Sequence, residues 1–177
     1  MRILIVAATL VLVACGTAPT TSPTAVTQPV IAIDEQGPFR LELELPGTVY
    51  APGEPIEALA RLRFAGPGST VIAGSGSGLI TTSLLDADGT ALTGAATADC
   101  VPYTVEAATP WTTGFVKSGG YVPDDPTDDF VESFLKDPIL RLPAGNWGVE
   151  ASAEFFGEGC NLPQIKLMTR VPIVVTE

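Results

Sequence analysis

The chain has 177 residues, with 20 Asp and Glu against nine Lys and Arg, and no His. A net charge of −11 argues against nucleic acid as a partner, because binding to phosphate depends on clustered Lys and Arg. The absence of His excludes Ser-His-Asp and Cys-His catalysis and every His-ligated metal site. The length fits one domain, and 18 Gly and 16 Pro favour many short strands and turns.

The N-terminal segment has the features of an export signal. Arg2 precedes a run of twelve residues, 3–14, that is apolar except for Thr9. As a helix this run would span only about 18 Å, well short of the roughly 30 Å hydrocarbon core of a bilayer. We therefore predict that residues 1–14 are a signal peptide rather than a membrane span.

The end of this segment reads Leu12-Val13-Ala14-Cys15, and Gly16 follows. It resembles the lipobox of bacterial lipoproteins, in which a branched apolar residue and two small residues precede an obligatory Cys. The resemblance implies that Cys15 becomes the mature N-terminus and carries acyl chains such as palmitate. These chains would hold an extracytoplasmic protein at the bacterial cell membrane, or at the outer membrane where two membranes exist. The alternative is an ordinary secretory signal with Cys15 near its cleavage site by chance.

Residues 15–36 are predicted to form a disordered tether. Positions 16–30 contain five Thr and three Pro but no charged residue. Such a segment has too little apolar surface to offset the entropy cost of ordering the chain. The composition changes near Gly37, so the folded domain is predicted to span residues 37–177.

Alternating patterns predict the strands. Residues 39–45 are apolar at odd positions and charged at even positions, which is typical of a half-buried strand. Apolar patterns between turn residues predict further strands at 55–64, 70–73, 79–85, 90–93, 101–107, 139–142, 147–156 and 164–176. Pro172 favours an edge or bulged position for the last strand. One short helix is predicted after Asp125, which would be its N-cap, and Pro138 ends it.

Eight or nine short strands with turns between them predict an all-β fold, an antiparallel sandwich with one short helix in a connection. The stretch Leu142-Pro143-Ala144-Gly145-Asn146-Trp147, followed by alternating apolar residues, resembles the late-strand entry of immunoglobulin-like bacterial surface domains. This resemblance supports the fold only. Trp147 begins the alternating strand and is therefore predicted to fill the core.

With Cys15 assigned to lipid, Cys100 and Cys160 remain. An even pair of cysteines in an exported protein predicts a disulfide, which we favour. The alternatives are two free thiols or a metal pair. A zinc site would lack ligands, because the chain has no His and no further Cys.

Five carboxylates lie within nine residues: Asp124, Asp125, Asp128, Asp129 and Glu132. One interpretation is a calcium site, because calcium binds six to eight oxygens from acidic loops. The other is a helix N-terminus at which the remaining acids are solvated. We favour the second interpretation, because the spacing of a dedicated calcium loop is missing. We expect no metal and no cofactor.

The segment from Thr109 to Pro123 places Trp111, Phe115 and Tyr121 among Thr, Ser and Gly. Aromatic side chains on such a loop can stack against a glycan or anchor a protein partner of the cell envelope. The alternative is that Trp111 and Phe115 cover one end of the sandwich.

Together these features predict a non-catalytic binding or adhesion domain that lipid holds at a membrane. One alternative is a structural or accessory subunit of a cell-envelope complex, which would use an open sheet edge. Another is a small hydrolase with paired carboxylates across a cleft. No such pair stands out in the sequence, so we do not expect an enzyme.

Overall fold

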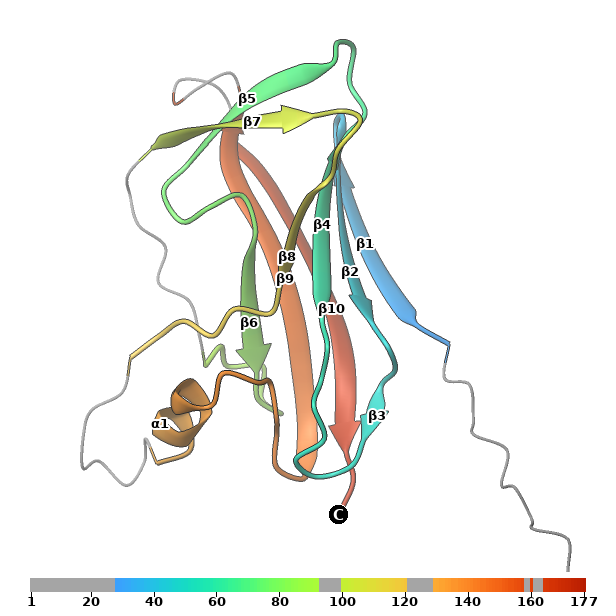
Figure 1. The fold of residues 1–177 in the computed structure, drawn as a ribbon, viewed down its shortest axis with the longest axis vertical. Coiled ribbons are helices and arrows are strands. Elements are labelled where there is room, and N and C mark those ends of the chain that lie inside the picture. The colour runs from blue at the N-terminus through green and yellow to red at the C-terminus, as the bar shows by residue number, and fades with distance from the viewer. Residues whose placement is uncertain (1–27, 93–99, 121–128, 158–159, 161–163) are drawn as a thin grey trace, which may run out of the picture.

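Two β-sheets pack face to face, so the chain folds as the all-β sandwich that the sequence predicts (Figure 1). The structure is a computed structural model that describes residues 28–92, 100–120, 129–157, 160 and 164–177. The first sheet has the order β1-β2-β4-β8, with bounds β1 Val30–Gln36, β2 Phe39–Leu45, β4 Leu59–Phe64 and β8 Trp111–Gly114. The second has the order β3-β10-β9-β5-β7, with β6 also paired to β9; its bounds are β3 Val49–Tyr50, β5 Thr70–Ser75, β6 Thr81–Leu85, β7 Val101–Glu106, β9 Gly145–Gly157 and β10 Gln164–Val175. Among these strands, only β3 and β10 pair in parallel.

The core lies between the two sheets and follows from the alternation in the sequence. The odd-numbered residues of β2, from Phe39 to Leu45, are all buried, and the charged residues between them lie on the outer face. The buried residues of β9 include Val149, Ala151 and Phe155. The rings of Phe39 and Phe155 meet edge-on with centroids 4.9 Å apart and so connect the sheets. Burial of each large side chain contributes roughly 1.5–3 kcal/mol to folding.

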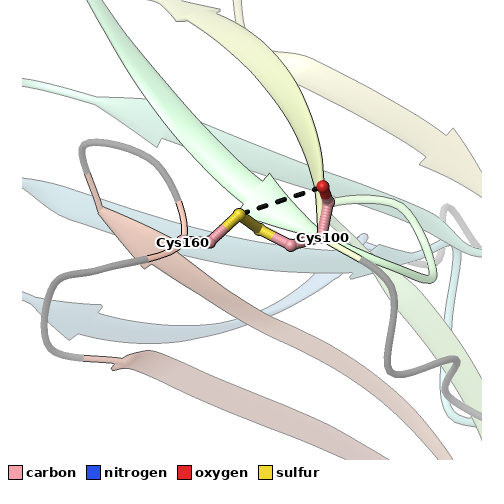
Figure 2. Close-up of a disulfide and its surroundings, with 2 residues drawn as sticks. All are labelled: Cys100 and Cys160. Atoms are coloured by element: carbon pink, nitrogen blue, oxygen red, sulfur yellow. Dashed lines mark hydrogen bonds between the residues drawn. A yellow bond between two sulfur atoms is a disulfide. The ribbon is translucent and has the colours of Figure 1, made fainter.

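A two-stranded ribbon, β5 with β7, runs crosswise over one end of the sandwich (Figure 1). The ladder between β5 and β9 is short, with Ala73 opposite Gly157 and Gly74 opposite Phe156. The predicted disulfide between Cys100 and Cys160 adds a covalent link (Figure 2). It joins the start of β7 to the connection between β9 and β10, with the two Cα atoms 6.1 Å apart.

Three strands lie where the sequence predicts none. β1 falls inside the predicted tether, so the prediction of disorder is wrong for residues 30–36 and the folded part begins before Gly37. β3 is only two residues long, and the hydroxyl of its second residue, Tyr50, donates to the Gly47 carbonyl at 2.8 Å. β8 lies in the segment predicted to be an aromatic loop.

Two predicted strands do not form among the described residues. The segment 139–142 buries both of its leucines, but its backbone bonds to the segment 53–56 are too few for a ladder. Pro138 and Pro143 flank it, and proline lacks the N–H that a ladder requires. In the predicted strand at 90–93, Ala91 forms an isolated bridge with Leu85.

The described helix, α1, spans Asp129–Lys136 and lies beside the sandwich (Figure 1). Its buried residue is Phe134, which is on the apolar face that the sequence predicts. The predicted N-cap, Asp125, lies outside the described residues. Within the described part of the chain, no helix is long and apolar enough to cross a membrane.

Trp147 does not fill the core, so this prediction is wrong. The side chain is half-buried and stacks on Phe130 of α1, with ring centroids 5.3 Å apart. Its indole N–H donates to the Pro143 carbonyl at 3.1 Å. Trp147 has an inward-facing position on β9, but it lies near the first residue of this strand, where α1 covers it.

Candidate interaction surfaces

β1 and β10 meet along one side of the sandwich through side chains rather than a backbone ladder; β1 is an edge strand, and β10 has an outer neighbour, β3, only at residues 174–175. Asp34 on β1 accepts the N–H of Met168 on β10 at 2.8 Å, and Gln36 accepts the N–H of Lys166 at 2.8 Å. The other carboxylate oxygen of Asp34 accepts the N–H of Glu35 at 2.9 Å. These side chains occupy backbone donors that an incoming strand would need.

Proline blocks two further edge positions. The even-numbered N–H groups of β10 point away from β9, so Pro172 lies on the outward edge, where a missing donor costs nothing. On β7, the Ala107 N–H donates to Ser69 at 2.8 Å, so Pro102 likewise faces away from β5. Side chains and prolines therefore block strand pairing at these positions of β10 and β7.

Trp111 is the first residue of β8, and 37% of its surface is exposed. Its ring packs edge-on against Tyr103, with centroids 5.5 Å apart. We call these two residues the aromatic patch. Tyr121, which the sequence analysis grouped with Trp111, lies outside the described residues. Tyr103 was missed, although it has an inward position on a strand that the sequence predicts.

Phe115 belongs to the border of the core rather than to an exposed surface. It is half-buried and faces Phe134 of α1, with ring centroids 6.5 Å apart. Lys117, two residues later, donates through Nζ to the carbonyls of Phe134, Asp137 and Ile139 at 2.7–2.8 Å. Burial lowers the pKa of Lys117. The lysine satisfies carbonyls at the C-terminal end of α1 and attaches the helix to this segment.

The predicted calcium cluster is only partly described. Asp124, Asp125 and Asp128 lie outside the described residues. Asp129 is in the first turn of α1, and Glu132 forms an ion pair with Lys136 one turn later. Where the structure describes the chain, it contains no group of three or more potential metal ligands.

A depression of about 520 Å³ lies on the outer face of the first sheet. It is lined by Pro29, Glu44, Pro46, Glu57, Ala58 and Leu59, and we call it the outer-face groove. The register of β2 and β4 creates it, because Glu44 pairs with Leu59 and so brings the end of one strand beside the start of the other. Both strands are predicted from the sequence, but their register is not, so sequence reasoning missed the groove.

The two carboxylates of the groove differ in their partners. Glu44 accepts a bond from Arg61, with Nη1 and Oε2 2.5 Å apart. Glu57 is exposed and forms no ion pair within the described residues. The groove therefore holds one carboxylate that an arginine neutralises, Glu44, and one carboxylate without an ion pair among the described residues, Glu57.

An ion-pair network covers the rest of this outer face. Arg40 contacts Glu35 at 2.8 Å and Glu42 at 2.7 Å, and Glu42 also contacts Arg63 at 3.4 Å. Burial raises the pKa of Glu42, but the hydrogen bond from Arg40 and the charge of Arg63 lower it by more. The net pKa therefore lies below the ordinary value for Glu. The arginines of this face are thus engaged with carboxylates other than Glu57.

No protein-family model matches the chain, and no curated protein matches its sequence.

Proposed function

We propose that this chain is a lipid-anchored extracytoplasmic protein whose β-sandwich binds a protein or glycan of the cell envelope without catalysing a reaction. The observation that carries the proposal is the sequence Leu12-Val13-Ala14-Cys15 at the end of a short apolar run. Two or more acyl chains on Cys15 would give stable anchoring. The disulfide between Cys100 and Cys160 supports export, because such bonds persist in oxidising compartments.

The aromatic patch supports the binding role. An indole that is partly exposed and packed on a tyrosine is a rigid contact group, and Trp and Tyr are enriched among the residues that dominate binding energy. Blocked edges on β7 and β10 give less support to a subunit that assembles through its sheet edge. The hydrolase alternative has less support too, because Glu44 of the groove is already paired with Arg61.

Copurification from detergent-solubilised membranes tests the binding role. We compare the wild-type protein, Trp111→Ala and the control Met168→Ala, which removes another large exposed apolar side chain, from β10. A partner should be recovered with wild type and Met168→Ala and be lost with Trp111→Ala. A stoichiometric partner recovered equally with all three would contradict the role of the patch and favour the envelope-subunit alternative.

A further inference from the structure

We infer that the outer-face groove binds one cationic side chain with an aliphatic stem, a lysine or arginine presented by a partner protein. This inference deepens the proposed binding function and depends on it for the identity of the partner. It uses a different surface from the aromatic patch.

The charges of the chain show why the cation must come from outside. Apart from Arg2, all Lys and Arg of the sequence lie in the described residues. The two arginines of β4 already form ion pairs with other carboxylates, Arg61 with Glu44 and Arg63 with Glu42. Glu57 therefore has no cation as a partner among the described residues, and the net charge of −11 of the chain favours positively charged partners.

The apolar walls of the groove favour a ligand that carries an aliphatic stem next to its charge. Pro29, Pro46 and Leu59, together with Ala58, present mostly carbon atoms. Lysine and arginine bury their methylene stems along such surfaces and keep the charged head at the rim. A single exposed ion pair contributes little by itself, so the stem has to supply much of the affinity. An uncharged apolar group would contact the walls of the groove but would leave Glu57 without a counter-charge.

The surroundings favour a protein as the source of this side chain. The groove lies on a sheet face, and Ile31, which pairs with Glu44, is 51% exposed beside it. An apolar side chain beside a small depression, with the charged groups around it, fits the apolar centre and polar rim of a protein contact surface. The partner would therefore insert one side chain and rest on the neighbouring face.

The test uses ¹⁵N-labelled full-length protein in a non-ionic detergent and the peptide Ac-Ala-Lys-Ala-NH2 as probe. The norleucine analogue has the same stem without the charge, and ammonium chloride has the charge without the stem. We expect saturable shifts of the Glu44, Ala58 and Leu59 amides with the lysine peptide only. Equal shifts with norleucine or ammonium, or no shift at these amides, would overturn the inference.

Variants locate the interaction. Glu57→Gln should raise the Kd for the lysine peptide by about fivefold, the effect of one exposed charge pair. The matched control Glu106→Gln, which removes an exposed carboxylate from β7, should leave the Kd unchanged. Equal effects of the two variants would show that only general charge attracts the peptide and would overturn the inference. Peptide binding does not require lipid on Cys15 or a recovered partner, so failure of the proposed function is measured separately.

Discussion

The carboxylate of Asp34 on β1 accepts the backbone N–H of Met168 on β10 at 2.8 Å, and this bond joins the two sheets along one side of the sandwich. The same carboxylate accepts the N–H of Glu35 through its other oxygen. One side chain therefore satisfies donors on two strands that form no ladder with each other. This arrangement closes the side of the sandwich and protects both edges from pairing with other chains.

Asp34→Ala should lower the free energy of unfolding by about 1–2 kcal/mol, because two backbone hydrogen bonds are lost. It should also increase self-association, because the N–H groups of Glu35 and Met168 become available. Urea unfolding and analytical ultracentrifugation measure the two effects. Asp88→Ala, which changes a residue of an exposed turn, is the control. If both variants behave alike, the proposed role of Asp34 is wrong.

Loss of the disulfide should destabilise the β5–β7 ribbon first, because its backbone pairing with β9 is short. The cysteines are 60 positions apart in the sequence, so the chain-entropy estimate for the loss is about 4 kcal/mol. Thermal unfolding with and without reductant measures the change, and amide exchange across β7 locates it. The double variant Cys100→Ala and Cys160→Ala should match the reduced protein and be insensitive to reductant. Unchanged exchange in β7 after reduction would contradict this prediction.

Acid should weaken the connection that follows α1. The backbone N–H of Ile139 and the guanidinium of Arg141 lower the pKa of Asp137 in the folded state. A carboxyl group with a lowered pKa in the folded state contributes stability that is present above its unfolded pKa of about 4 and is lost as the pH falls through the folded pKa. The stability difference between wild type and Asp137→Asn should therefore shrink below about pH 4.

Carboxyl-carbon NMR titration checks this directly, with the protein unfolded in urea as the reference. The titration midpoint of Asp137 should be lower in the folded protein than in urea. An equal or higher midpoint in the folded protein would show that the bonds from Ile139 and Arg141 do not favour the charged carboxylate.

The sequence predicts the fold class because strands such as β2 alternate apolar and charged residues along their whole length. β1 was missed because its outward residues, Ile31 and Ile33, are apolar and exposed, whereas the polar Asp34 bonds to the other sheet. The outer-face groove depends on which residue of β2 pairs with which residue of β4. Register of that kind is decided by packing between distant segments, so a local pattern does not reveal it.

We propose that lipid on Cys15 holds an exported domain at a membrane, and mass spectrometry of the N-terminal peptide from the membrane-bound protein detects this modification. We expect this peptide to begin at Cys15 and to carry a diacylglyceryl group, and Cys15→Ala should abolish both the modification and palmitate labelling. A mature protein that begins at another residue, or an unmodified Cys15, would contradict this proposal.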